Sequence, residues 1–274
     1  MPRRAKKSLG QNYLVNDSAA RRIVEAVRPA PEDLVFEIGP GRGALTRHLA
    51  SSGAMTVSFE IDRQHCRDLD EAFSGTGNVS IVEADVLDID FDGEARKRGR
   101  ESFKIVGNIP YMLTSSVLIR IPGWKRASLS VIMVQKEVAD RILEEPGNRN
   151  CGVMTVFLKS YLDAEKVLGV RAGSFRPSPR VDSTVCRFRP VVREGAPADR
   201  EQFLLFLKLA FSRRRKKLRN SLLEGEAEEK RRLQERLEDS SGVDMNRRAE
   251  NLKLEEWFSL FESFRIMVGF DETE

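Results

Sequence analysis

The stretch that decides the fold is LVFEIGPGRG at residues 34–43. Its first half is a run of apolar and β-branched residues, typical of a buried strand, and its second half holds three glycines. Glycine lets the backbone turn sharply and lets a ligand approach the main chain. A helix-like segment follows at residues 44–52. A strand, a glycine turn and a helix in this order predict an open α/β sheet with a ligand beyond the strand end.

The alternation of strands and helices continues along the chain. The next apolar, strand-like runs are residues 56–62, 79–85, 103–110 and 128–135. Residues 63–74, between the first two of these runs, are helix-like. This alternation predicts a parallel sheet that is covered by helices on both faces. Two later strand-like runs, residues 166–170 and 184–189, need not be parallel. We therefore expect a doubly wound α/β domain over residues 1–193.

The character of the sequence changes near residue 193. Residues 190–199, PVVREGAPAD, are typical of a linker, and apolar residues then recur at helical spacing. We expect a small all-helical domain over residues 194–274. Within it, KLAFSRRRKKLR at residues 208–219 has seven basic residues and no acidic one. Such a run is either a solvated helix face or a surface that binds a polyanion such as RNA.

Composition excludes several classes of protein. Of the 274 residues, 41% are hydrophobic, which is enough for a core and excludes a disordered chain. The longest stretch without a charged side chain, residues 105–119, is too short to span a membrane. The basic N-terminus lacks the apolar core of a secretory signal. Three widely spaced cysteines fit the reducing cytoplasm, and the presence of only His48 and His65 argues against catalysis or metal binding built on several histidines.

Two carboxylates are expected at the same edge of the sheet as the glycines. Glu60 follows Gly39 by 21 residues, where a carboxylate can accept both hydroxyls of a ribose. Asp85 ends the third strand and could accept from the amino group of an adenine. Either residue alone could instead cap a helix. The G-x-G-x-G spacing differs from the dinucleotide motif and no P-loop is present, so the pocket favours the phosphate-free S-adenosylmethionine.

The fourth strand ends in Asn108-Ile109-Pro110-Tyr111. The amine of adenine is a poor nucleophile because its lone pair is delocalised into the ring. The Asn108 side-chain oxygen and a backbone carbonyl near Pro110 could hold its hydrogens aside and aim the lone pair at a methyl group, while Tyr111 stacks on the flipped base. The tetrapeptide alone could be a strand-ending turn. In combination with the glycine turn and the two carboxylates, the tetrapeptide predicts methyl transfer. This reaction needs alignment of the reacting groups more than a strong base.

Taken in order, these motifs closely resemble the bacterial small-subunit ribosomal RNA adenine dimethyltransferases. The segments that carry the resemblance are KSLGQNYL at residues 7–14, GPGRG at 39–43, FEID at 59–62, EAD at 83–85, NIPY at 108–111, FRPSPRVDS at 175–183 and AFSRRRKKLRNSL at 210–222. They extend over nearly the whole chain. The resemblance implies a Rossmann-like class I methyltransferase sheet with a small C-terminal all-α domain. It also implies dimethylation of two adjacent adenosines near the 3′ end of 16S rRNA, in an immature small subunit.

The resemblance further assigns roles to individual residues. The cofactor, S-adenosylmethionine without a metal, would be held by Gln11, Asn12, Leu14, Gly39, Gly41, Glu60, Asp85 and Asn108. The catalytic residues would be Asn108, Pro110 and Tyr111. RNA would be contacted by Phe175, Arg213, Arg214, Arg215, Lys216 and Lys217. Phe175 could equally be a packing aromatic. Nothing in the sequence requires more than a monomer.

Three alternatives remain open at this point. The sister group that methylates 23S rRNA and confers macrolide resistance shares the catalytic motifs, although the N-terminal K-x-L-G-Q and the RRRKKLRNSL segment fit the small-subunit group better. A ribosome-assembly or transcription factor could use the same fold only to bind RNA. A nicotinamide oxidoreductase is opposed by the glycine spacing.

Overall fold

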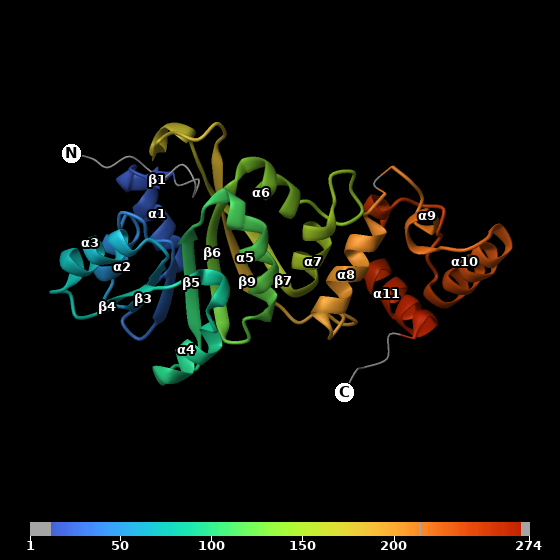
Figure 1. Cartoon of the computed structure of the whole chain (residues 1–274), viewed down its shortest axis with the longest axis horizontal. Coiled ribbons are helices and arrows are strands. Elements are labelled where there is room, and N and C mark those ends of the chain that lie inside the picture. Colours follow the sequence, from blue (N-terminus) through green and yellow to red (C-terminus); the bar gives the residue numbers. More distant parts are fainter. Residues whose placement is uncertain (1–11, 214, 270–274) are drawn as a thin grey trace. The chain divides into compact units, whose positions relative to one another are not determined.

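The computed structural model describes residues 12–213 and 215–269, and the chain forms two compact units (Figure 1). The first unit combines the chain up to Ala139 with Ala164–Pro190, and the second combines Asp140–Asp163 with the chain from Val191 onward. The division predicted between residues 193 and 194 differs from this one mainly in residues 140–163, which group with the C-terminal helices. As a boundary between a catalytic and an RNA-binding domain, that division stays a prediction.

A seven-stranded sheet with the order β4-β3-β2-β5-β6-β9-β7 is the framework of the first unit. Its strands are β2 (Leu34–Ile38), β3 (Met55–Glu60), β4 (Val79–Glu83), β5 (Phe103–Asn108), β6 (Ala127–Gln135), β7 (Leu162–Val170) and β9 (Ser183–Pro190). The pairs from β4 to β6 are parallel, whereas β9 runs antiparallel to β6. The prediction of an α/β sheet is confirmed. The strand order reverses between β2 and β5, which is where ligands of such sheets bind.

Helices cover both faces of this sheet. Those that begin within the first 136 residues are α1 (Asp17–Val27), α2 (Thr46–Ala50), α3 (Arg63–Phe73), α4 (Phe91–Lys97), α5 (Thr114–Arg120) and α6 (Lys136–Ile142). Ile23 of α1 belongs to one buried cluster with Val35 of β2. The next residue, Phe36, points to the other face. There its ring lies 5.3 Å, between centroids, from that of Phe91 at the start of α4.

A short two-stranded sheet lies outside the main one. It pairs β1 (Tyr13–Leu14) with β8 (Phe175–Arg176) in antiparallel register, and the backbone N–H of Val15 donates to the carbonyl of Ser174 at 2.8 Å. These strands are not predicted by the sequence, because two-residue strands carry no periodic pattern. Their pairing brings the chain just before α1 to the loop between β7 and β9.

The second unit is helical. Its helices are α7 (Val153–Tyr161), α8 (Arg200–Ala210), α9 (Arg219–Leu222), α10 (Ala227–Ser241) and α11 (Leu254–Val268). Aromatic side chains form its core, where the rings of Phe203 and Phe206 on α8 lie 5.2 and 5.4 Å from that of Phe261 on α11. The predicted small all-α region is confirmed.

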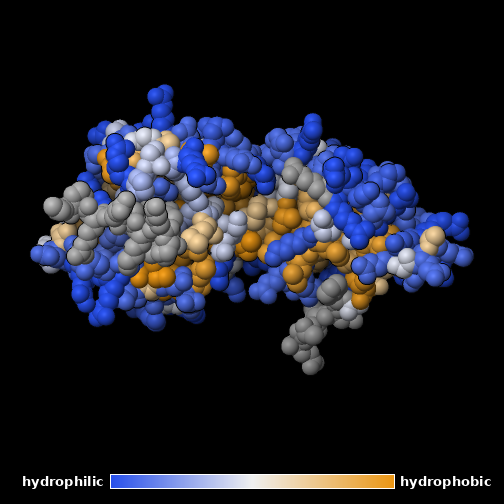
Figure 2. Space-filling view, turned by 45° about the horizontal axis from the view of Figure 1, so that its top comes forward, coloured by the Kyte–Doolittle hydropathy of each residue, from blue (hydrophilic) through white to orange (hydrophobic). Residues whose placement is uncertain are grey.

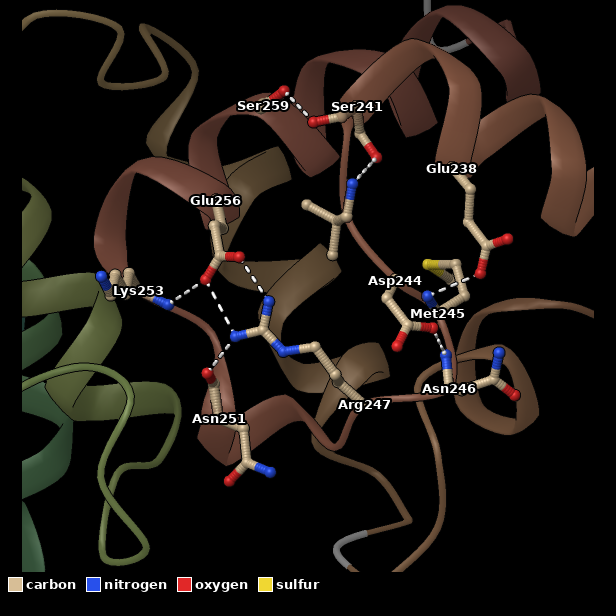
Figure 3. A network of polar contacts seen from close by, with 11 residues as sticks. Glu238, Ser241, Asp244, Met245, Asn246, Arg247, Asn251, Lys253, Glu256 and Ser259 are labelled. Atoms are coloured by element: carbon tan, nitrogen blue, oxygen red, sulfur yellow. Dashed lines mark hydrogen bonds and ion pairs between the residues drawn. The ribbon is translucent and has the colours of Figure 1, made fainter.

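A network of polar contacts holds the loop between α10 and α11 (Figure 3). Both terminal nitrogens of Arg247 contact the carboxylate of Glu256, and the Lys253 N–H donates to the same carboxylate at 2.7 Å. The hydrogen bond from Arg247 lowers the pKa of Glu256. The Leu218 N–H donates to the Arg247 carbonyl at 2.9 Å, and Lys217 Nζ donates to Asn246 Oδ1 at 3.2 Å. This loop therefore anchors the C-terminal end of the basic run.

The face drawn in Figure 2 carries both hydrophilic and hydrophobic areas. Hydrophobic areas, drawn in orange, lie between hydrophilic blue ones on the face in view (Figure 2). Exposed large apolar residues of the first unit include Ile61 and Met112, with 53% and 67% of their area accessible. Over the part of the chain that the structure describes, no helix is both long and apolar enough to cross a membrane.

Candidate functional site

The turn after β2 brings backbone N–H groups and a carboxylate together. Gly39 and Gly41 have φ values of +66° and +56°, in a backbone region that residues other than glycine rarely adopt. The Gly41 N–H donates to Glu60 Oε2 at 3.0 Å, which ties the turn to the end of β3. A Cβ atom on Gly41 would lie 3.2 Å from the ring of Tyr13. Glycine is therefore required here both by backbone conformation and by the close approach of β1.

A cavity of about 270 Å³ opens beside this turn. Its walls contain nine of the residues predicted from the sequence: Asn12, Leu14, Gly39, Gly41, Glu60, Asp85, Asn108, Pro110 and Tyr111. These residues come from β1 and from the carboxyl ends of β2, β3, β4 and β5, because parallel strands end at the same edge of the sheet. Exposed Ile61 and Met112 also line it, which gives the cavity apolar surfaces suited to flat rings.

The two predicted carboxylates are already partly engaged. Glu60 is 4% exposed, and its Oε1 accepts from the Asp62 N–H at 2.9 Å. Asp85 Oδ1 accepts from the Leu87 N–H at 2.9 Å, so this residue does cap a short helical turn. A carboxylate oxygen has two acceptor sites. Both side chains therefore hold their own loops while keeping acceptor sites for hydroxyl or amino groups in the cavity.

The end of β5 presents an oriented carboxamide. Asn108 Nδ2 donates to the carbonyl of Asn12 at 3.3 Å, so Oδ1 is the end of the amide left to accept a hydrogen bond. The Pro110 carbonyl accepts from the Leu113 N–H at 2.9 Å. The Tyr111 hydroxyl and Ser183 Oγ lie 2.8 Å apart, and burial raises the pKa of Tyr111. We call Asn108, Pro110 and Tyr111 the reactive corner.

Glu37 is a cavity residue that the sequence analysis did not identify. It is 1% exposed, and its Oε2 accepts from Thr46 Oγ1 at 2.8 Å and from Ser58 Oγ at 2.7 Å. Its Oε1 has no hydrogen-bond partner among the described residues. Burial raises the pKa of this carboxyl to about 7. An acidic residue inside an otherwise apolar strand was the signal that could have identified it.

Tyr13 and Arg42 also belong to the cavity wall and were not predicted to. The Arg42 guanidinium carbon lies 4.5 Å from the centre of the Tyr13 ring, and that ring packs edge-on against His65 at 5.4 Å. A cation over an aromatic face is a stabilising contact. The contact between Arg42 and Tyr13 therefore joins the glycine turn to β1.

Other predicted residues lie elsewhere. Phe175 is 1% exposed in the buried cluster that contains Leu14, and it is absent from the cavity wall. This burial favours the packing interpretation, and its contact with a target base stays a prediction. Gln11 and Arg214 lie outside the described residues. The rest of the basic run is exposed and belongs to the second unit: Arg213, Arg215, Lys216 and Lys217.

Comparisons with known proteins agree with this geometry. The sequence profile of the family described as ribosomal RNA adenine dimethylase matches residues 3–265. A protein of Geobacter metallireducens, described as ribosomal RNA small subunit methyltransferase A, is 37% identical, with 97% of this chain and 98% of that protein covered. One of the same description from Thermotoga maritima is 37% identical over 96% of this chain and 86% of its own length.

Two solved structures match the fold over most of the chain. The 23S rRNA methyltransferase ErmE is 29% identical with a TM-score of 0.67, covering 92% of this chain and 99% of its own. A dimethyladenosine transferase from Plasmodium falciparum is 24% identical with a TM-score of 0.76, covering 92% of this chain and 97% of its own. At that identity the second match concerns the fold alone. Both agree with a class I methyltransferase sheet followed by C-terminal helices.

Proposed function

Because this chain belongs to the ribosomal RNA adenine dimethylase family, we infer that it dimethylates the N6 amines of two adjacent adenosines near the 3′ end of 16S rRNA. The substrate would be the maturing small ribosomal subunit in the cytoplasm, and the methyl donor S-adenosylmethionine. Relatives described as small-subunit methyltransferases are 37% identical over nearly the whole chain, against 29% for the 23S rRNA enzyme. This difference favours the small-subunit substrate.

The cavity contains the acceptors and apolar surfaces that the methyl donor requires. Glu60 would accept the ribose hydroxyls and Asp85 the adenine amino group. The unpartnered Oε1 of Glu37 is an acceptor suited to an ammonium group near the glycine turn. When bound there, the donor supplies a methyl group on a positively charged sulfur. Gly39 and Gly41 let the main chain approach it, and Asn12 and Leu14 close the wall on the side of β1.

The reactive corner would act by orientation. Asn108 Oδ1 accepts one N6 hydrogen, and a backbone carbonyl near Pro110 accepts the other. The lone pair of N6 would then point at the methyl group that a bound donor supplies, so that the new N–C bond could form as the C–S bond breaks with its electron pair left on sulfur. The N6 proton is lost to water afterwards. Tyr111, fixed by Ser183, would stack on the extruded base. Alignment accounts for the catalysis, so no strong base is needed.

The second unit would supply phosphate contacts. Four described side chains of the basic run are exposed, and its C-terminal end is anchored by the loop that carries Arg247. Contacts to phosphates position an RNA without reading its sequence, so we assign the choice of base to the cavity. The cavity and the predicted catalytic residues come from a single chain, and a monomer would suffice.

The observation that carries the proposal is the Asn108 amide, held by the Asn12 carbonyl beside the glycine turn. The test is transfer of labelled methyl groups to small subunits from a strain without the modification, with the modified nucleotides mapped by primer extension. Asn108→Ala should still bind RNA and transfer almost no label. Asn148→Ala, which alters an exposed amide of the second unit, is the matched control and should stay active. Large subunits of the same strain are assayed in parallel. Label on their 23S rRNA with none on the small subunits, or full activity of Asn108→Ala, would contradict the proposal.

A further inference from the structure

The loop between β7 and β9, residues 171–182, is held together by Asp182. Its Oδ1 accepts from the Ala172 N–H at 2.9 Å, and its carbonyl accepts from the Lys136 N–H at 2.9 Å. Ser178 Oγ also donates to the Ala172 carbonyl at 2.9 Å. The loop is thus closed on itself and tied to α6, so its exposed side chains project from a fixed backbone.

Two arginines of this loop are exposed, and their side chains have no ion-pair or hydrogen-bond partner in the described part of the chain: Arg171 and Arg180. Arg176 differs, because its Nη1 donates to the carbonyls of Gly173 and Phe175. The loop's acidic side chain, Asp182, already accepts a backbone hydrogen bond. Arg171 and Arg180 therefore keep their positive charge for an external anion, and a guanidinium matches a phosphate with two parallel hydrogen bonds.

The loop adjoins the reactive corner. Ser183, which follows Asp182, is the hydrogen-bond partner of Tyr111, and the charge of Asp182 adds to the rise in the pKa of Tyr111 that burial causes. A residue spans at most about 3.6 Å, so the Cα of Arg180 lies within about 11 Å of that of Ser183. Arg171 precedes Ala172, which Asp182 contacts directly. In Figure 1 the loop is the yellow segment beside β1.

We propose that Arg171 and Arg180 bind backbone phosphates of the RNA on either side of the adenosine that enters the reactive corner. This contact lies in the first unit and is distinct from the basic run at residues 213–217. It rests on the proposed function for the identity of the RNA and for the entry of an adenosine into the reactive corner. Its role is to fix the nucleotides that flank an extruded base, which an anchored loop does better than a flexible tail.

The test measures binding of a fluorescent single-stranded RNA that contains two adjacent adenosines, from 0.05 to 0.5 M salt. Each lost phosphate contact should reduce the slope of log affinity against log salt by about 0.7. At 0.1 M salt, that reduction corresponds to an affinity for RNA that is about fivefold lower. Arg171→Ala/Arg180→Ala should therefore lose about 1.4 of slope and transfer fewer methyl groups to small subunits. The charge-preserving Arg171→Lys/Arg180→Lys should keep the slope. Calorimetric affinity for S-adenosylhomocysteine and the melting temperature should not change.

Arg22→Ala is the matched control, since Arg22 is an exposed arginine of α1 whose side chain has no ion-pair or hydrogen-bond partner in the described part of the chain. An unchanged slope in the double alanine variant would overturn the proposal, as would an equal loss in Arg22→Ala. If the wild-type protein transfers no methyl groups to small subunits but the slope falls only in the loop variant, the proposed function fails and the phosphate contact stands.

Discussion

Replacing Glu37 with glutamine should change how the stability of the protein depends on pH. In the folded protein, burial raises the pKa of this carboxyl to about 7, from an ordinary value of 4.5. Between these two pH values the folded state holds a proton that the unfolded chain has already released. The free energy of unfolding of the wild type should therefore fall as pH rises from 4.5 to 7.

The size of this fall follows from the shift. A displacement of about 2.5 pKa units, at 1.36 kcal/mol per unit, corresponds to about 3 kcal/mol. Glutamine has no proton to lose, and its oxygen can accept from Thr46 and Ser58 as Oε2 does. The unfolding free energy of Glu37→Gln minus that of the wild type should thus increase by about 3 kcal/mol from pH 4.5 to pH 8.

Urea denaturation of both proteins at pH 4.5, 6, 7 and 8, without methyl donor, measures this difference. Other ionisable groups titrate in both proteins and cancel in the comparison. Glu71→Gln alters an exposed glutamate on α3 and should give a difference that does not vary with pH. A Glu37→Gln difference that is equally flat would refute the idea that the buried carboxyl is protonated in the folded state.

Two further predictions concern the cavity and the core. Gly41→Ala combines a φ of +56° with a contact of 3.2 Å to Tyr13, so it should destabilise the protein by roughly 1–2 kcal/mol and weaken calorimetric binding of S-adenosylhomocysteine. Gly75→Ala, where a Cβ meets nothing within 4 Å, should leave that binding unchanged. Phe91→Ala removes a ring that packs on Phe36 and should cost about 3–5 kcal/mol in urea denaturation; a loss under 1 kcal/mol would mean that α4 does not depend on this contact.

The part of the site that could be predicted from the sequence comes from strand ends. A parallel strand places its carboxyl end at the same edge as its neighbours, so Glu60, Asp85 and Asn108 could be brought together without knowledge of their distances. Glu60 and Asn108 end strands whose buried character is visible locally, whereas Asp85 follows the β-branched run of the edge strand β4, which has no buried residue. The helices of the second unit were also predictable from local sequence, because their apolar residues recur at helical spacing.

Contacts between segments far apart in the chain could not be predicted in this way. The pairing of Tyr13–Leu14 with Phe175–Arg176 joins two-residue strands about 160 positions apart, and no local pattern indicates it. The partners of Glu37 are two hydroxyls on α2 and β3 that look like ordinary surface side chains in the sequence. The burial of Phe175 depends on the same long-range packing. Tertiary contacts of this kind decide which polar group is buried and which aromatic is exposed.

The pairing of β1 with β8 makes one wall of the cavity depend on residues that are added late during synthesis. The glycine turn and the carboxyl ends of β2, β3, β4 and β5 have all been synthesised once residue 111 has been added. The cavity wall that contains Asn12 and Leu14 depends on the pairing of β1 with the strand at Phe175–Arg176, which is synthesised later. A nascent chain that ends before Phe175–Arg176 lacks this pairing, so we expect the cavity wall on the side of β1 to form only when the first unit is nearly complete.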